Sequence, residues 1–190
     1  RNCLVGSEMC IRDRDIPLVI PEINGDDITN LQAPSLIANP NCSTSQLLMA
    51  ISPIHKEFII DFLNVATYQA VSGTGKQAVQ ELQNQIKDKT SRQEVYPKQI
   101  AFNVIPQCDI FLDNDFTKEE MKLVWETKKI LDSSIEVQAT CVRVPVLNGH
   151  SEAVFFRTKK ESSRNQIIEL LSNEPGIDVI DNPKSLEYPT

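Results

Sequence analysis

Residues 135–146 read Ile-Glu-Val-Gln-Ala-Thr-Cys-Val-Arg-Val-Pro-Val, and their odd-numbered positions are apolar apart from one arginine. This period of two is typical of a β-strand that buries one face. A turn signal follows at Asn148-Gly149, and Glu152–Thr158 has the composition of a second strand. The three segments together predict an antiparallel hairpin.

Helix-like and strand-like segments alternate along the rest of the chain. Thr117 and Glu120 form a capping-box pattern at the start of the clearest helix, which runs toward Leu131. Further helices are predicted at 41–52, where Pro53 is expected to disturb the helix, and at 74–87 and 162–173. Further strands are predicted at 16–20, 59–68 and 177–180, and loops at 24–26 and 88–93. The mixture predicts an α/β or α+β fold with a mixed, largely antiparallel sheet and helices packed on it.

Composition narrows the classes of protein. The 190 residues suit one sizeable domain or two small ones, and the net charge of −7 comes without a basic cluster. A nucleic-acid or anionic-membrane partner is therefore not expected. No apolar run reaches the length of a membrane span and no secretory signal is present, which predicts a soluble, cytoplasmic protein. Five scattered cysteines and two histidines suit neither a disulfide framework nor a metal site.

The segment Asn39-Pro-Asn-Cys-Ser-Thr44 places Cys42 beside three residues that could cap a helix, Asn41, Ser43 and Thr44. Unpaired N–H groups and the positive end of the helix dipole favour the thiolate, which is the form that attacks carbonyl carbons. The alternative is a buried, inert cysteine.

Four other positions admit a functional and a structural interpretation. Arg143 lies on the apolar face of its strand, so it must meet an anion, which is either an internal carboxylate or a ligand. His150 is either a surface residue of the turn or a proton carrier that the hairpin brings back toward Arg143. Glu119 and Lys122 are a solvated i,i+3 ion pair unless they form part of a site.

The segment Thr67-Tyr-Gln-Ala-Val-Ser-Gly73 connects a strand to a helix. It is either an ordinary connection or part of a site, in which Gln69 would hold a substrate carbonyl. The Ser72-Gly73 turn would then let the backbone approach a flat ring.

Five motifs in order resemble aspartate-semialdehyde dehydrogenase. They are Asn39–Thr44, Thr67–Gly73, Ala101-Phe-Asn-Val-Ile-Pro-Gln107, Thr140-Cys-Val-Arg-Val-Pro-Val146 and Gly149-His-Ser-Glu-Ala153. The resemblance covers residues 15–190. It implies a fold like the C-terminal domain of glyceraldehyde-3-phosphate dehydrogenase, a homodimer or tetramer, and a place in lysine, threonine and methionine biosynthesis.

The implied reaction is the NADPH-dependent reduction of aspartyl phosphate to aspartate semialdehyde, with release of phosphate. The resemblance implies a role for each matching residue. Cys42 is the nucleophile, Gln69 orients the acyl group, Asn41 helps to stabilise the oxyanion together with N–H groups at the helix start, and His150 is the acid/base. Arg143 pairs with the substrate carboxylate, Glu119 with its amine and Lys122 with phosphate, while Ser72 and Gly73 line the nicotinamide site of NADP.

The chain departs from the family at its two ends. It lacks the glycine fingerprint of the nucleotide-binding (Rossmann) domain, and residues 1–14 do not match the run that usually precedes Pro17-Leu18. We therefore expect residues 1–14 to be a foreign or misassembled segment and residues 15–40 to be the end of the nucleotide-binding domain. Residues 41–190 are expected to be a catalytic and dimerisation domain that is cut at its C-terminus.

Two other functions remain open from the sequence. N-acetyl-γ-glutamyl-phosphate reductase uses the same chemistry, but its cysteine motif resembles Asn-Pro-Gly-Cys-Tyr-Pro-Thr rather than residues 39–44. The chain alone could also be a fragment that folds and dimerises without turnover, because the missing phosphate loop is the main anchor for NADP.

Overall fold

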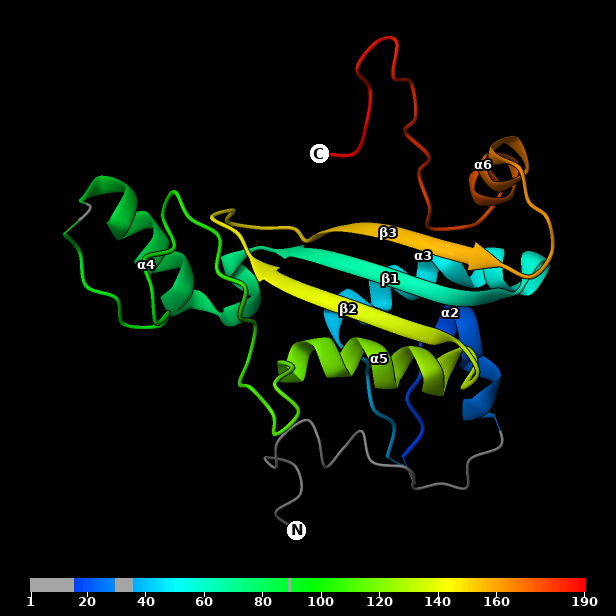
Figure 1. Cartoon of the computed structure of the whole chain (residues 1–190), viewed down its shortest axis with the longest axis horizontal. Helices are drawn as coiled ribbons and strands as arrows, with labels where there is room; N and C mark the ends of the chain where they lie inside the picture. The colour runs from blue at the N-terminus through cyan, green and yellow to red at the C-terminus, as the bar shows by residue number, and fades with distance from the viewer. Residues whose placement is uncertain (1–15, 30–35, 89) are drawn as a thin grey trace. The chain divides into compact units, whose positions relative to one another are not determined.

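The computed structural model describes residues 16–29, 36–88 and 90–190. Helices and strands are mixed, as predicted (Figure 1). The elements in chain order are α2 (Pro21–Asn24), η1 (Gly25–Ile28), α3 (Cys42–Phe58), β1 (Ile60–Gln69), η2 (Val71–Thr74), α4 (Lys76–Lys87), α5 (Lys118–Ile130), β2 (Glu136–Arg143), β3 (Ser151–Thr158) and α6 (Arg164–Ser172).

The three strands form one sheet in the order β2-β1-β3. The end of β3 pairs with the start of β1, where Lys159 N donates to Ile59 O, so these two strands are antiparallel. The ends of β2 and β1 lie together, where Val144 N donates to Gln69 O, so this pair is parallel. The arrows of β2 and β3 accordingly point in opposite directions in Figure 1. The predicted mixed sheet is confirmed.

The predicted hairpin between residues 135–146 and 152–158 is wrong, because β1 lies between the two strands. The connection is longer than the Asn148-Gly149 turn and takes up residues 144–150. It crosses the end of β1, where Val71 N donates to Val146 O and Ser72 N donates to Leu147 O. These bonds supply the backbone partners that a tight turn would have made locally.

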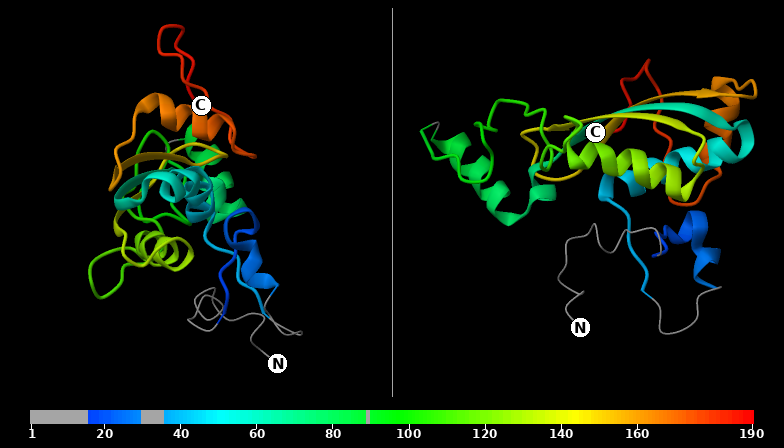
Figure 2. Two further views of the ribbon diagram at one scale, coloured as in Figure 1. Left: turned by 90° about the vertical axis from the view of Figure 1, so that its right-hand side faces the viewer. Right: turned by 60° about the horizontal axis from the view of Figure 1, so that its bottom comes forward.

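The chain divides into two compact units, each of which is described by itself. The first contains the described residues up to Phe62 together with Glu126–Ile135 and Phe156–Thr190. In this unit α3 contacts α2 and α6, and both views of Figure 2 show α3 between them. Leu48, Ile51 and Ile54 of α3 are at most 3% exposed.

Pro53 does not end α3, which continues to Phe58. A proline inside a helix costs about 3 kcal/mol. Ile54 and Phe58, one and five residues beyond it, are both buried. Because each buried side chain of this size contributes about 1.5–3 kcal/mol, their burial offsets the cost of the proline.

The second unit contains Leu63–Trp125 and Glu136–Phe155. Here α4 packs against η2 and begins two residues later than predicted, after Gly75, whose φ is 112°. Two buried side chains of α4 hold the loop that follows it. Glu81 Oε2 accepts from Glu94 N and Val95 N, and Gln85 Oε1 accepts from Ile100 N and Ala101 N.

Other predictions fail at the ends of the chain. Residues 16–20 make only an isolated bridge between Leu18 and Ala38, and residues 177–180 form no strand. The predicted loop at 24–26 is occupied by the short helices α2 and η1. Short apolar runs do not by themselves define a strand, which needs a partner along its length. Residues 1–14 lie outside the described part of the chain. In that part, no helix is long and apolar enough to cross a membrane.

Candidate active site

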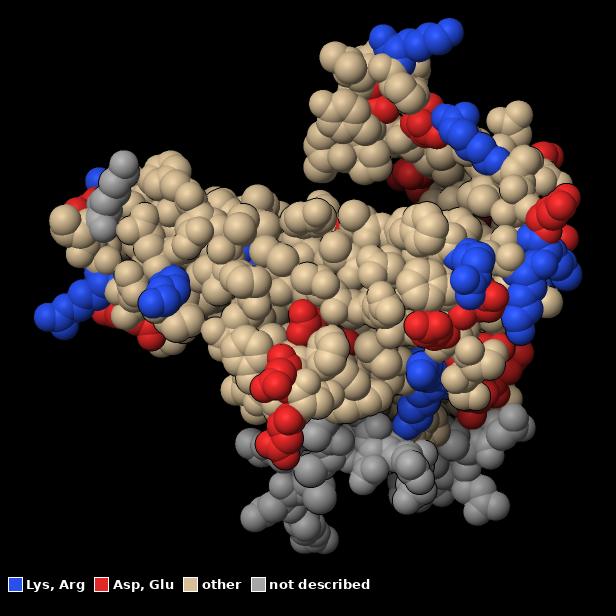
Figure 3. All heavy atoms as spheres, in the orientation of Figure 1, with Lys and Arg blue, Asp and Glu red and all other residues tan. Residues whose placement is uncertain are grey.

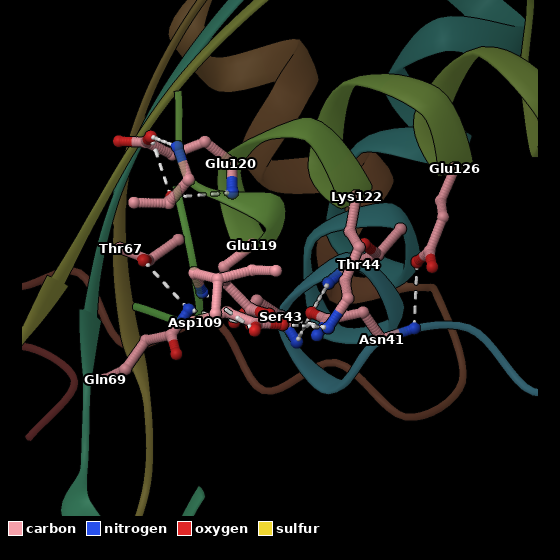
Figure 4. A network of polar contacts seen from close by, with 12 residues as sticks. Asn41, Ser43, Thr44, Thr67, Gln69, Asp109, Glu119, Glu120, Lys122 and Glu126 are labelled. Atoms are coloured by element: carbon pink, nitrogen blue, oxygen red, sulfur yellow. Dashed lines mark hydrogen bonds and ion pairs between the residues drawn. The ribbon is translucent and has the colours of Figure 1, made fainter. Parts of the chain in front are cut away.

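Cys42 is the first residue of α3 and is exposed, so the interpretation as a buried, inert cysteine is wrong. Asn41 is the N-cap, and its Oδ1 accepts from Ser43 N at 2.9 Å and Thr44 N at 3.3 Å (Figure 4). The thiol of Cys42 is therefore open to solvent at the capped start of a helix.

The cap takes up two of the N–H groups at the helix start that are expected to stabilise the oxyanion. The N–H groups of Ser43 and Thr44 bond to the Asn41 side chain, and the N–H of Cys42 is not part of this cap. Asn41 is itself held by Glu126, whose Oε2 accepts from Asn41 N at 2.8 Å (Figure 4). The Glu126 carboxylate therefore holds the peptide between Pro40 and Asn41, one residue before Cys42.

The second unit contains the other seven predicted site residues. Arg143 is only 6% exposed and ends β2, on the buried face that the sequence predicted. Its Nη1 donates to Ala70 O at 2.8 Å, and its buried Nε has no hydrogen-bond partner among the described residues. Within the described residues Arg143 makes no ion pair, so the interpretation that it meets an internal carboxylate is not supported. A buried guanidinium that forms no ion pair among the described residues is suited to binding an anion.

Glu119 and Lys122 form a buried pair with Nζ and Oε2 3.2 Å apart, and each side chain is 9% exposed. The interpretation as a solvated surface pair is therefore wrong. Glu119 Oε1 also accepts from Gln69 Nε2 at 3.2 Å, which brings together three predicted site residues (Figure 4).

Sequence reasoning missed Asp109, whose Oδ2 lies 3.1 Å from Lys122 Nζ. Burial alone would lower the pKa of Lys122, but the Glu119 and Asp109 carboxylates outweigh it and raise the pKa above its usual value. Asp109 has a φ of 69°, a conformation that aspartate and asparagine adopt more readily than most residues. Nothing in the local pattern of the sequence connects this loop residue with α5.

Glu120 fixes the start of α5, which carries Glu119 and Lys122. Its Oε2 accepts from the N and Oγ1 of Thr117, and Thr117 Oγ1 accepts from Glu120 N, so the predicted capping box is confirmed. Its Oε1 accepts from Cys141 N at 3.2 Å, which ties the helix to β2.

We expect Glu120→Ala to lower the free energy of unfolding by about 2–3 kcal/mol, because a cap is lost and the Cys141 N–H is left without a partner. Urea denaturation measures the change. Glu136→Ala is the matched control, since Glu136 is an exposed glutamate of β2. A loss in Glu120→Ala no larger than in the control would contradict this role.

His150 is half-buried, so it is not a surface turn residue. Its Nδ1 accepts from Ala70 N at 3.1 Å. Burial lowers the pKa of the imidazole, and the nearby Arg143 charge adds to this. A Cβ built on Gly73 would lie 3.1 Å from both Arg143 Nη1 and His150 Nε2. The predicted closeness of His150 to Arg143 is thus found, without the predicted hairpin.

Ser72 and Gly73 lie in η2, and both are exposed. Cys108 and Cys141 are each 1% exposed, and burial raises the pKa of the Cys108 thiol to about 11. Core packing, the role expected for Cys141, fits this burial.

The described residues contain no group of three or more side chains arranged to hold a metal ion.

A comparison of the chain with known protein families identifies its class. The family described as semialdehyde dehydrogenase, dimerisation domain, matches residues 51–190. The match covers more than half of the chain, and the chain belongs to this family.

Curated relatives are named aspartate-semialdehyde dehydrogenase. The chain is 47% identical to that of Aquifex aeolicus and 49% identical to that of Shewanella violacea over 183 residues, covering 93% and 94% of this chain. It spans 54% of the length of each.

Solved structures agree. The fold matches aspartate semialdehyde dehydrogenase II from Vibrio cholerae, in a crystal structure complexed with ASA, with a TM-score of 0.83 at 47% identity. This match covers 86% of the present chain and 50% of that one. The enzyme from Francisella tularensis matches with a TM-score of 0.81 at 30% identity, covering 95% and 58% of the two chains.

Proposed function

We propose that this chain is the catalytic and dimerisation part of an aspartate-semialdehyde dehydrogenase, which reduces aspartyl phosphate to aspartate semialdehyde and releases phosphate. The observation that carries the proposal is the exposed Cys42 at the capped N-terminus of α3. The names of the relatives and the resemblance of the five motifs support the same reaction. In this proposal the reaction serves lysine, threonine and methionine biosynthesis in the cytoplasm.

The thiolate of Cys42 attacks the acyl carbon of the substrate. A carbon–sulfur bond forms, the carbon–oxygen bond to phosphate breaks, and inorganic phosphate leaves with the electron pair. The product is a thioester on Cys42. In this account the Asn41 amide contributes to holding the oxygen that becomes negative during the attack, as the resemblance implies.

Four other predicted residues recognise the substrate in this proposal. Arg143 binds the α-carboxylate, because its buried guanidinium has no carboxylate of its own among the described residues. Glu119 binds the amine and Lys122 the phosphate, while Gln69, bonded to Glu119, orients the acyl group. Each pairing joins opposite charges, or a donor and an acceptor, in a buried place, where such bonds are strong.

His150 is the acid/base of the reaction. Its Nδ1 is occupied because it accepts a hydrogen bond from Ala70 N, so Nε2 is the nitrogen that exchanges a proton with the reacting groups. Ser72 and Gly73 would line the nicotinamide of NADP, which supplies the hydride when bound. The exposure of both residues in η2 supports this role, and a crystal structure of the enzyme from Candida albicans was obtained with NADP. The preference for NADP follows from the resemblance.

The same chain forms a homodimer in this proposal, in agreement with the family description. Tyr68 of β1 and Phe155 of β3 are 45% and 67% exposed. Figure 3 shows few charged side chains over the strands. An uncharged surface with large apolar side chains is typical of a subunit interface.

The acyl-transfer half of the reaction tests the proposal without any cofactor. The chain is mixed with aspartyl phosphate, or in parallel with N-acetyl-γ-glutamyl phosphate, and phosphate release and protein mass are followed. We expect release of one phosphate per chain with aspartyl phosphate only, and peptide mapping that locates the aspartyl group on Cys42. Acylation of another cysteine, or release with the second compound only, would contradict the proposal.

A further inference from the structure

Two functional side chains from different parts of the chain lie where a Cβ of residue 73 would be. A Cβ built on it would lie 3.1 Å from Arg143 Nη1, from His150 Nε2 and from His150 Cε1. Contacts of this length are tighter than nine in ten real Cβ contacts, so both side chains would have to shift by a few tenths of an ångström.

Backbone conformation does not explain the glycine. The glycines with positive φ are Gly75, Gly149 and Gly176 among the described residues, and Gly73 is not one of them. Alanine can therefore adopt the backbone conformation of residue 73. The obstacle to alanine at this position is space, because its methyl group would lie too close to the Arg143 and His150 side chains.

The peptide of Ala70, three residues earlier, holds the same two side chains from the other direction. Its carbonyl oxygen accepts from Arg143 Nη1 at 2.8 Å, and its N–H donates to His150 Nδ1 at 3.1 Å. Gly73 N in turn donates to Ala70 O at 3.2 Å, which closes the turn. One short turn thus sets the place of both the guanidinium and the imidazole.

We propose that Gly73 is a positioning residue, whose missing Cβ leaves the space in which the Arg143 guanidinium and the His150 ring are held against the Ala70 peptide. This goes beyond lining a cofactor, and its catalytic meaning rests on the proposed function. A displacement of about 1 Å at a reacting group lowers a rate by about 100-fold, so the shift of a few tenths of an ångström expected here should cost less than that.

The first test reads the position of His150 without any activity. The chain has two histidines, His55 and His150, and a His55→Gln variant assigns their ring signals in an NMR titration. The groups that act on His150 are the Gly149 carbonyl, Arg143 of β2 and Glu119 of α5. In the folded chain burial lowers the pKa of His150, so its midpoint should lie below 6.5.

We expect Gly73→Ala to shift the ring signals of His150 and to raise its midpoint toward 6.5, because the ring is pushed away from Ala70 N and from Arg143. The signals of His55 should stay in place. Gly25→Ala is the matched control, since Gly25 has a φ of −57° and no atom within 4 Å of a built Cβ. Unchanged His150 signals in Gly73→Ala would overturn the inference.

A second variant keeps the test decisive if the single variant fails to fold. Combining Gly73→Ala with Arg143→Ala gives the new methyl group room, so the double variant should fold. The shift of the His150 signals between Arg143→Ala and the double variant should be smaller than the shift that Gly73→Ala causes in the parent chain. An equal or larger shift would overturn the inference, as would a double variant that remains unfolded while Arg143→Ala folds.

The catalytic arm uses a chimera in which residues 16–190 replace the matching part of the Aquifex aeolicus enzyme. We expect Gly73→Ala to lower kcat and raise KM for aspartate semialdehyde, with kcat/KM reduced about 3- to 10-fold. Gly25→Ala should keep the parent values. An inactive parent chimera would contradict the proposed function, whereas an active parent with an unaffected Gly73→Ala variant would contradict this inference alone.

Discussion

Replacing Cys42 by serine is expected to abolish turnover in the chimera, with kcat lowered by about four to six orders of magnitude. A serine hydroxyl at this position is isosteric with the thiol, but it is not ionised near neutral pH and is a much weaker nucleophile. The Asn41 cap and α3 do not depend on the sulfur, because the capping bonds use the N–H groups of Ser43 and Thr44. Phosphate-dependent NADPH production measures the loss.

Cys108→Ala is the control for the sulfur chemistry. Burial raises the pKa of this thiol to about 11, so it is protonated near neutral pH and should not react. Its replacement is expected to lower stability but to leave kcat within a factor of about two. Retention of more than a few per cent of the rate in Cys42→Ser would contradict the role of Cys42.

Arg143→Lys is expected to raise KM for aspartate semialdehyde about 10- to 100-fold with a smaller change in kcat. A guanidinium can bond a carboxylate through two parallel N–H groups, and an ammonium is a point charge with a different reach. The loss of one charge-assisted bond in a buried place is worth about 1.5–3 kcal/mol, which corresponds to this range. Steady-state kinetics over a range of semialdehyde concentrations separates the two constants.

Arg157→Lys provides the comparison at an exposed position. The side chain of Arg157 is 63% exposed and pairs with Asp61, so the same substitution there should change neither constant. An unchanged KM in Arg143→Lys, or an equal rise in both variants, would contradict the assignment of Arg143 to the substrate carboxylate.

Local patterns in the sequence correctly predict the structural features that depend on residues close together in the chain. Alternation from residue 135 placed Arg143 on the buried face of β2, and the capping box of Thr117 and Glu120 placed the start of α5. The cap at Asn41 was one of three candidates, and the structure selects it. These features involve residues a few positions apart, so the pattern contains the whole interaction.

Predictions that depend on distant pairing were less successful. Whether residues 135–146 pair with 152–158 depends on β1, which lies about 70 residues earlier in the chain. The contact of Asp109 with Lys122, and the placement of Arg143 and His150 where a Cβ of residue 73 would be, also join separate segments. The sequence showed the glycine and suggested only that backbone could approach a ring. The spatial reason, two side chains that fill the place of a Cβ, is visible only in the fold.

Turnover with aspartate semialdehyde, phosphate and NADP tests directly whether Cys42 and its partners form an aspartate-semialdehyde dehydrogenase site. Aspartate semialdehyde, phosphate and NADP are supplied to the chimera containing residues 16–190 and, separately, to the chain alone, and NADPH production is recorded. We expect phosphate-dependent NADPH production by the chimera, and little or none by the chain without a nucleotide-binding domain. A folded chimera that produces no NADPH, or produces it equally well without phosphate, would contradict the account.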